Sequence, residues 1–517
     1  MNRAYDTVVI GAGHNGLVCA HALAQAGDSV LVLEASDSVG GYAAHREFAP
    51  GYQASRGAHY LHQFPDSLLK DLDLAKHGLT FAADRIPTCV IGNGRVVSLD
   101  GANAHGVSPG DAAAWRRLTS QLERFGRFMA RLQGQVPPRL GTTAFADRLQ
   151  LLKLGLRLRL LGRKDMRELL RIAGMNVYDL ARDELSDPLL QAALGMDAIL
   201  GSNYGPRSPG SVLTLLTRRG NEAATAAGCR LPSGGLAGFS SALAEAARAA
   251  GVTICCDSPV TGIVVENDVA CGVELASGEH IVAGRVVSSV DPRQTFLQLL
   301  GTSHLDTGFV RRVDHHRQRG ITAKLHLALD GLPAFTGLSP VQHGHRLLLA
   351  PSLDAIESAY NASKYGEVSE RPVLEVMLPT VHDPSLAPQG HHVLSAVVSY
   401  SAYDTKTDLA TARQALLDGC LRVLQEVAPG IQHQIRASEL LLPKDLEKTN
   451  RSLGGHWHHG ELAFDQFLMV RPFPGAAQYE SPVRGLFLCG AGSHPGGGLT
   501  GLPGRIAAER IQKVGAP

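Results

Sequence analysis

The 517-residue chain has no excess of charge of either sign, since 49 Lys and Arg residues balance 48 Asp and Glu residues for a formal net charge of +1. Recognition of nucleic acid needs a basic surface, so we expect no nucleic-acid partner. The sequence also lacks any run of about 18 uninterrupted apolar residues and therefore predicts no membrane-spanning helix. Because the first strand-like run starts at Asp6, we expect no cleaved signal peptide.

Cysteine patterns that hold metals or redox-active disulfides are missing. The eight cysteines include no C-x-x-C pair and no metal-ligand spacing, and the adjacent Cys255 and Cys256 fall in a strand-like run. A dithiol reductase needs two cysteines a few residues apart, so we expect neither disulfides nor dithiol chemistry. This cysteine usage is typical of a reducing compartment, and we predict a cytoplasmic location.

Glycine, in contrast, is abundant, with 57 residues and no repeat. Near the N-terminus a strand-like run over residues 7–10 leads into Gly11-Ala12-Gly13-His14-Asn15-Gly16 and an Ala- and Leu-rich helix, and the next strand ends at Glu34. Such a turn lets the backbone approach a pyrophosphate at a helix N-terminus, and the acid accepts hydrogen bonds from a ribose while repelling a 2′-phosphate. The pattern predicts a dinucleotide site that disfavours NADP. No second such fingerprint follows, so we expect no tightly bound nicotinamide cofactor.

Two further glycine loops complement this turn. Gly40 and Gly41 follow shortly after Glu34, where a glycine pair lets a second loop approach the same pyrophosphate. At the other end of the chain, a strand over 486–489 enters the glycine-rich run 490–498 and a helix over 504–514. The chain thus begins and ends with a strand, a glycine turn and a helix.

Between these ends the pattern changes twice. Residues 114–216 have Leu and Ala at helical spacing, strand signals return from residue 231, and 320–474 mixes β-rich runs with one amphipathic helix. We predict an α/β protein with a discontinuous Rossmann-like dinucleotide-binding domain, an inserted mixed-sheet substrate domain and a helical cap. The predicted boundaries are 1–80, 225–300 and 475–517 for the dinucleotide-binding domain, 81–224 for the mostly helical cap, and 301–474 for the second sheet domain.

The C-terminal run from Gly485 to Gly498, together with the two N-terminal glycine loops, resembles the phytoene desaturase and carotenoid and retinoid oxidoreductase family of FAD flavoproteins. The resemblance implies FAD bound in an extended form, and no covalent attachment is expected because the cysteine-bearing attachment motif is missing. Tyr42 stands where this group often has an arginine, so the N-terminus of the last helix would balance more of the pyrophosphate charge. The cofactor-binding residues implied are Gly11, Gly13, Gly16, Glu34, Gly40, Gly41, Ala58, Val260, Gly490, Ala491, His494, Gly498 and Leu499.

Four residues are candidates for the reaction itself. In this flavoprotein group the segment that holds His59 and Tyr60 passes near the flavin ring, so both are candidates for proton transfer or substrate orientation, the alternative being a packed aromatic pair. Lys324 lies on an apolar strand, where similar amine oxidases place a lysine that holds a water against flavin N5, the alternative being a salt-bridged strand lysine. We predict Lys324 and His59 on opposite sides of the flavin's reacting edge, and His494 near the ring.

His459 belongs to the stretch His456-Trp457-His458-His459, for which a zinc site is the competing interpretation. Zinc needs three or four ligands, and adjacent histidines in a β-prone stretch point to opposite faces. We therefore expect no metal and place His459 on the substrate side.

The function that this resemblance favours is an FAD-dependent oxidoreductase of the phytoene desaturase type. It would move hydride between flavin N5 and an apolar small-molecule substrate, with desaturation or saturation of a carbon–carbon bond. The alternatives are a redox-neutral flavin-dependent isomerase, an amine oxidase-like enzyme, which Lys324 favours and Ala491 disfavours, and a non-catalytic flavin-binding interaction protein. The sequence decides neither the substrate, the electron acceptor nor the oligomeric state.

One segment bears on location. Residues 148–171 hold eight Lys or Arg and two acidic residues among many leucines, which fall on more than one helical face. The segment is either a cap helix with a solvated basic edge or a membrane-surface contact through which a lipidic substrate enters, and peripheral membrane attachment is the alternative to a purely cytoplasmic protein.

Overall fold

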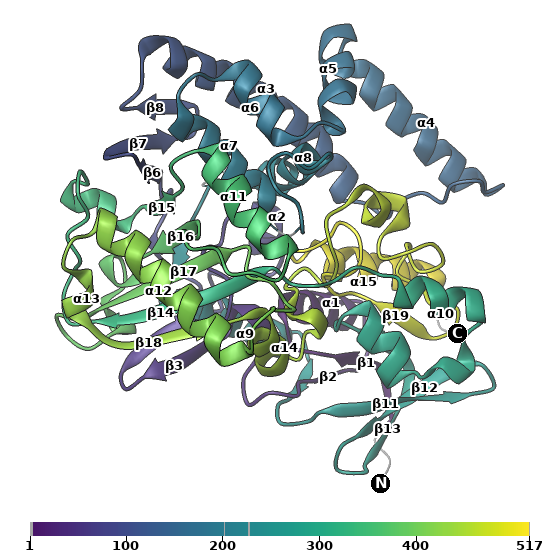
Figure 1. Cartoon of the computed structure of the whole chain (residues 1–517). Coiled ribbons are helices and arrows are strands. Elements are labelled where there is room, and N and C mark those ends of the chain that lie inside the picture. Colours follow the sequence, from purple (N-terminus) through teal and green to yellow (C-terminus); the bar gives the residue numbers. More distant parts are fainter. Residues whose placement is uncertain (1–3, 201, 226–227, 516–517) are drawn as a thin grey trace.

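The computed structural model describes residues 4–200, 202–225 and 228–515. Its first sheet has seven strands and contains strands from both ends of the chain (Figure 1). The strands run in the order β10 (Thr253–Cys255), β2 (Val30–Leu33), β1 (Ala4–Ile10), β13 (His280–Ser288), β12 (Val269–Leu275) and β11 (Val260–Glu266), and β19 (Leu486–Leu488) also pairs with β13. Strands β10, β2, β1, β13 and β19 pair in parallel, whereas β11 and β12 pair antiparallel. The expected Rossmann-like sheet is confirmed.

Alternation along β1 sets what covers each face of this sheet. Val9 lies in a core formed with three helices, while Val8 and Ile10 point to the other face and pack with Phe296 and Phe473. The three helices are α1 (His14–Gln25), α9 (Gly235–Ala249) and α15 (Leu502–Val514). The glycine turn between β1 and α1 therefore sits at the carboxyl end of a central parallel strand, which is where open α/β sheets bind ligands.

The second sheet has eight strands and lies on the left in Figure 1. Its order is β18 (Ile435–Leu441), β14 (Thr322–Leu329), β17 (His392–Ser399), β16 (Leu374–Met377), β15 (Arg346–Leu349), β6 (Thr88–Gly92), β7 (Arg95–Asp100) and β8 (Asn103–His105). Helix α12 (Leu409–Val427) covers one face, where Leu416 and Leu424 pack against Leu325. The strands over 88–105 lie within the region 81–224 that we expected to be mostly helical.

Six helices form a layer at the top of the molecule (Figure 1). They are α3 (Pro109–Gln133), α4 (Phe145–Leu160), α5 (Arg163–Ala173), α6 (Val177–Glu184), α7 (Pro188–Ile199) and α8 (Ser211–Glu222). The Ser108 side chain caps α3 by accepting from the backbone N–H of Asp111. The helices form a hydrophobic core of their own, which Leu348 and Val90 of the second sheet join, so the layer packs directly on that sheet.

The remaining elements are short. They are β3 (His45–Ala49), β4 (Tyr52–Ser55), α2 (Asp66–Asp71), β5 (Phe81–Ala83), β9 (Leu231–Pro232), α10 (Thr307–Asp314), α11 (Leu353–Lys364), α13 (Ile431–Gln434) and α14 (Pro443–Asn450). Within the part of the chain that the structure describes, no helix combines the length and the apolar character needed to span a bilayer.

Candidate active site

A long cavity lies between the two sheets. At one end it is lined by Gly11, Glu34 and Val260, which stand at strand ends of the first sheet. At the other end it is lined by Val397 and Glu375 of the second sheet. An elongated ligand bound here would reach from the glycine turn to the face of the second sheet.

The glycine turn leaves room for a phosphate group at a helix end. Gly13 lines the cavity, and a Cβ built on it would have no protein atom within 4 Å, so the space before it is open. Helix α1 begins just after Gly13 with no side-chain cap, which leaves its first N–H groups free for an anion. Gly16 has the opposite role, because its Cβ would lie 2.1 Å from the carbonyl oxygen of Gly11. The turn is therefore closely packed at Gly16 and open toward the cavity at Gly13.

Glu34 holds the same loop in place. Its Oε2 accepts from the backbone N–H of Ala12 at 2.8 Å, and its Oε1 accepts from that of Ser36 at 2.9 Å. The carboxylate also lines the cavity, so it can accept from a ribose hydroxyl. Val260 lines the same end.

The glycine pair reaches the same place from a second loop. Gly40 donates its backbone N–H to the carbonyl oxygen of Ala12 at 2.9 Å, and its φ of 114° favours glycine. A Cβ there would come 2.5 Å from the Ser240 hydroxyl. Gly40, Gly41 and Tyr42 all line the cavity.

A cation that sequence reasoning missed also lines this part of the cavity. The Arg56 guanidinium lies 3.6 Å from the Asp37 carboxylate and within 3.5 Å of the Ser36 hydroxyl. It can supply the positive charge that Tyr42 lacks. The sequence does place Arg56 in the same segment as His59, but the direction in which the Arg56 side chain points depends on the fold.

The C-terminal glycine loop closes the cavity with some of the residues expected and without others. Ala491, Gly498 and Leu499 line it, as does Ala58, whereas Gly490 packs against the first sheet, where its Cβ would lie 2.3 Å from the carbonyl oxygen of Ser289. His494, which we expected near the ring, is not among the residues that line the cavity. His494 is fully buried and donates from Nε2 to the carbonyl oxygen of Leu132 at 3.1 Å, which ties the loop to α3 instead.

At the second-sheet end, His59 and Lys324 touch. Lys324 Nζ lies 2.9 Å from His59 Nε2, and both side chains are buried. His59 and Tyr60 line the cavity, but Lys324 stands behind His59. The expectation that the two residues occupy opposite sides of a reacting edge is therefore wrong, because β14 passes directly behind the segment that holds His59. Among the described residues His59 Nδ1 and the Tyr60 hydroxyl have no hydrogen-bond partner.

Burial shifts the protonation of this pair. It lowers the pKa of Lys324 from 10.5 to about 7, which the Glu375 carboxylate partly opposes, and it lowers the pKa of His59 well below 6.5, with the Lys324 charge as a second cause. His59 is therefore neutral, and Lys324 changes charge close to neutral pH.

A row of side chains crosses the second sheet at this point. Lys324 on β14 pairs with Val397 on β17, which pairs with Glu375 on β16. Because directly paired residues share a face of a sheet, Lys324 and Glu375 flank Val397 on the face toward the cavity. The register of the three strands thus fixes the relative positions of Lys324, Val397 and Glu375.

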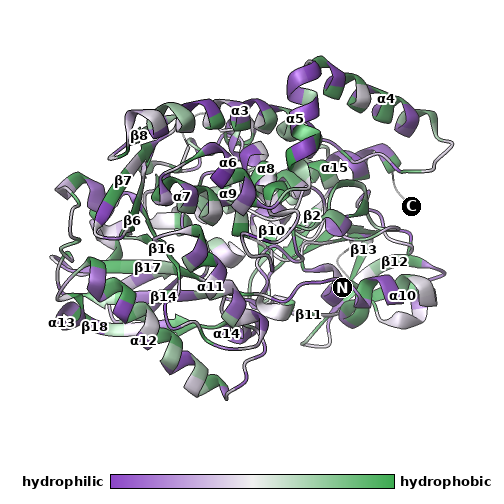
Figure 2. Cartoon of the chain, turned by 45° about the horizontal axis from the view of Figure 1, so that its top comes forward, coloured by the Kyte–Doolittle hydropathy of each residue, from purple (hydrophilic) through white to green (hydrophobic). Residues whose placement is uncertain are grey.

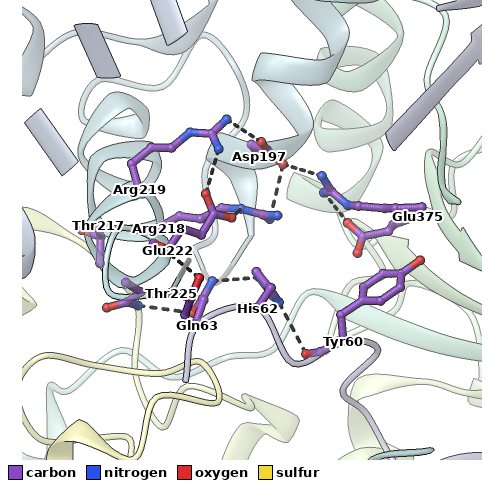
Figure 3. Close-up of polar contacts among 12 residues, drawn as sticks. Tyr60, His62, Gln63, Asp197, Thr217, Arg218, Arg219, Glu222, Thr225 and Glu375 are labelled. Carbon is purple, nitrogen blue, oxygen red and sulfur yellow. Dashed lines mark hydrogen bonds and ion pairs between the residues drawn. The ribbon is translucent and has the colours of Figure 1, made fainter. Parts of the chain in front are cut away.

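Glu375 begins a chain of buried charges that runs up into the helical layer (Figure 3). Arg346 donates to Glu375 at 2.6 Å and contacts Asp197 at 2.9 Å. Asp197 also pairs with Arg218 at 3.3 Å and Arg219 at 3.0 Å, and both arginines bind Glu222. Three cations balance three anions, so the network adds no net charge to the cavity wall. Sequence reasoning missed it, because the partners are far apart in the chain.

Arg471 fixes the histidine stretch against the C-terminal loop. Its fully buried guanidinium donates to the carbonyl oxygens of His458, Gly460, Glu461, Gln466, Ala491 and Ser493. His459 lines the cavity together with Trp457 and His458, and its carbonyl oxygen accepts from His316 Nε2 at 3.0 Å. Its place on the substrate side stays a prediction. Within the described ranges no group of three or more His, Cys, Asp or Glu side chains is arranged to hold a metal ion.

The free space and the donors fit an extended dinucleotide cofactor. The open front of Gly13, the free N–H groups of α1, Arg56 and the ribose-accepting Glu34 form one end, and unpartnered His59 Nδ1 and Tyr60 hydroxyl lie at the other. These residues would hold the pyrophosphate, the ribose and the ring edge of FAD.

Comparison with known proteins agrees with this geometry. Residues 16–511 match the family described as flavin containing amine oxidoreductase. The chain is 33% identical over 550 residues, 98% of this chain and 93% of the relative, to the mouse (Mus musculus) protein called pyridine nucleotide-disulfide oxidoreductase domain-containing protein 2. It is 28% identical over 346 residues, 66% of this chain and 63% of the relative, to the neurosporene-forming phytoene desaturase of Cereibacter sphaeroides. The crystal structure of an oxidoreductase from Methanosarcina mazei has the same fold, with a TM-score of 0.59, 20% identity, and coverage of 99% of this chain and 100% of that one.

The fold and the site thus define an FAD-dependent oxidoreductase. The chain belongs to the flavin-containing amine oxidoreductase family and resembles the mouse protein along nearly its whole length. The name of that relative refers to disulfides, but the cysteines of this chain are all free, and Cys255 lies on β10 rather than beside a partner in the cavity.

Proposed function

We propose that this protein transfers hydride between flavin N5 and an apolar substrate, with desaturation or saturation of a carbon–carbon bond. FAD, when bound, supplies the hydride acceptor or donor. One observation carries the proposal: His59 faces the cavity while Lys324 lies behind it at 2.9 Å, and both are buried. A proton-carrying pair in a dry site is what the second half of such a reaction needs.

Desaturation requires a group that accepts a proton from the substrate. Forming a double bond removes a hydride from one carbon and a proton from its neighbour. The carbon proton passes to His59 Nδ1, which has no partner, while the proton on Nε2 moves to the neutral amine of Lys324. With a pKa of about 7, Lys324 accepts that proton near neutral pH, and saturation runs the same transfer in reverse.

Apolar side chains in the cavity wall support an apolar substrate. Leu200, Val397 and Trp457 line the cavity, and Tyr60 adds a ring whose hydroxyl has no hydrogen-bond partner among the described residues. The phytoene desaturase relative, by its name, desaturates phytoene and forms neurosporene. Amine oxidation is the second candidate, favoured by the family that the chain matches. Against it stands Ala491, where amine oxidases usually have an acid.

The proposal includes the place of the enzyme. An apolar substrate is held in membranes, and contact of the segment 148–171 with a membrane surface would bring the enzyme to it.

Anaerobic titration of the purified holoenzyme tests the proposal. We expect detergent-dispersed polyenes or retinoids to bleach the oxidised flavin band, and primary amines to leave it unchanged. Bleaching by amines alone would show an amine oxidase. A rearranged double bond in the product with no bleaching would show an isomerase. Either outcome overturns the proposal.

A further inference from the structure

Helix α4 (Phe145–Leu160) stands apart from the rest of the chain. Figure 1 shows it projecting from the helical layer, and none of its residues is buried. Figure 2 shows apolar and polar residues alternating along it. A helix that is polar all round would need no explanation here, but this one carries a phenylalanine and many leucines.

The exposed apolar residues of α4 form one stripe. At about 100° per residue, positions separated by steps of three and four fall on one face of a helix. Phe145, Leu149, Leu152, Leu156 and Leu160 follow this spacing, with 78%, 36%, 69%, 55% and 75% of their surfaces exposed. The leucines that seemed scattered over several faces in the sequence therefore include a continuous outward stripe.

A second apolar stripe holds the helix to the protein. Leu154 and Leu158 are half-buried and pack against the core of the helical layer. On the same side Gln150 donates to the carbonyl oxygen of Val136 at 2.5 Å, and Asp147 accepts from Gln478 at 3.1 Å. The outward stripe is thus not the attachment face of the helix, since α4 already has one.

Cations border the outward stripe on both sides. By the same helical spacing, Arg148 and Arg159 fall along one edge, and Lys153 and Arg157 along the other. None of the four has an ion-pair partner among residues 4–200, 202–225 and 228–515. The single acid of the helix, Asp147, is on the attachment side, where it binds Gln478.

We infer that α4 lies in the surface of an anionic membrane. Its outward leucines would enter the boundary between headgroups and acyl chains, while the bordering cations bind lipid phosphates and carboxylates. A second copy of this chain fits the face less well, because stacking two such helices would bring eight unpaired cations together. The inference deepens the membrane contact included in the proposed function. It rests on α4 and is tested without turnover, so the membrane contact and the hydride transfer can fail separately.

Vesicle flotation with the holoenzyme tests the inference. We expect the protein to float with vesicles of phosphatidylcholine mixed with phosphatidylserine, and weakly or not at all with phosphatidylcholine alone. Replacing Leu152, Leu156 and Leu160 together with Ser should lower the partition coefficient by at least about tenfold. Each Lys or Arg to Gln change along the edges should lower it by about fivefold.

Val341→Ser is the matched control, because Val341 is 77% exposed and lies far from α4 in the sequence. It should leave flotation unchanged. Flavin content and melting temperature should not change in any of these variants, since the altered side chains are exposed. Failure of the wild-type protein to float with anionic vesicles overturns the inference. So does a dimer in sedimentation velocity that the triple serine variant dissociates without any change in flotation.

Discussion

Lys324 Nζ lies 2.9 Å from Nε2 of His59, and only the histidine of this pair lines the cavity. In the proposed function the lysine would therefore act on a bound substrate through the imidazole. The arrangement differs from that expected from the sequence, in which the lysine itself holds a water at the flavin. If the proposal is right, mutation of either residue interrupts the same proton path.

A double-mutant cycle measures this coupling. Lys324→Met and His59→Gln should each slow anaerobic flavin reduction by about 10²-fold or more, because each interrupts the same proton path. The double variant should then be no slower than the slower single variant. Lys406→Met combined with His59→Gln is the control, since Lys406 is exposed and its effect should simply add. Additive effects for Lys324 and His59 would mean that they act independently.

The stability of the protein should depend on pH through Lys324. Its pKa of about 7 lies below the ordinary 10.5, so between these values the unfolded chain binds one more proton than the folded chain. Wild-type stability therefore rises with pH in this window, and below it the cost of the buried ammonium is present in full. Lys324→Met removes that cost. Urea unfolding near about pH 6 and about pH 9 should show a larger stabilisation by the variant at the lower pH. An equal stabilisation by Lys324→Met at both pH values would contradict a buried lysine that titrates near neutral pH.

Gly13→Val should abolish flavin binding while leaving the apoprotein folded. The φ of Gly13 is −69°, and a side chain there would meet no protein atom, so only the cofactor's space is lost. Flavin absorbance after gel filtration and the melting temperature of the apoprotein measure the two effects. Gly174→Val is the control, because Gly174 is also open and has a φ of −93°. A yellow Gly13→Val protein would place the pyrophosphate elsewhere.

Arg471→Lys should weaken both the fold and cofactor binding. Lysine cannot reach the six carbonyl oxygens that the guanidinium binds, so several buried acceptors lose their donors, at a cost of about 3 kcal/mol or more. Urea unfolding and flavin titration measure the two losses. Arg484→Lys, at an exposed arginine, should change neither. A stable variant with normal flavin affinity would show that the loops hold without Arg471.

The parts of the fold predictable from sequence were those set by local pattern. The glycine turn between β1 and α1 and the run that forms β14 could be recognised because hydrophobic period, glycine spacing and the terminal acid all lie within a few tens of residues. The assignment of β6 to the second sheet could not be predicted, because its partner strand β15 follows more than two hundred residues later.

The site shows the same division. Gly13, Glu34 and His59 belong to sequence motifs, and all three line the cavity. Arg346 links Glu375 on a strand to Asp197 on a helix, and no sequence motif connects the two. His494 binds the carbonyl oxygen of Leu132 on α3, a contact that its own glycine-rich motif does not predict. Contacts of this kind depend on tertiary packing.

The pH dependence of anaerobic flavin reduction by an apolar substrate tests the central claim most directly. In the wild-type protein the rate of reduction in the stopped-flow should rise with pH and level off above a midpoint near 7, because only the neutral amine of Lys324 accepts a proton through His59. Lys324→Met should bind the same amount of flavin but reduce it about 10²-fold more slowly and without that midpoint. A variant that keeps the wild-type rate and the same midpoint would contradict the account.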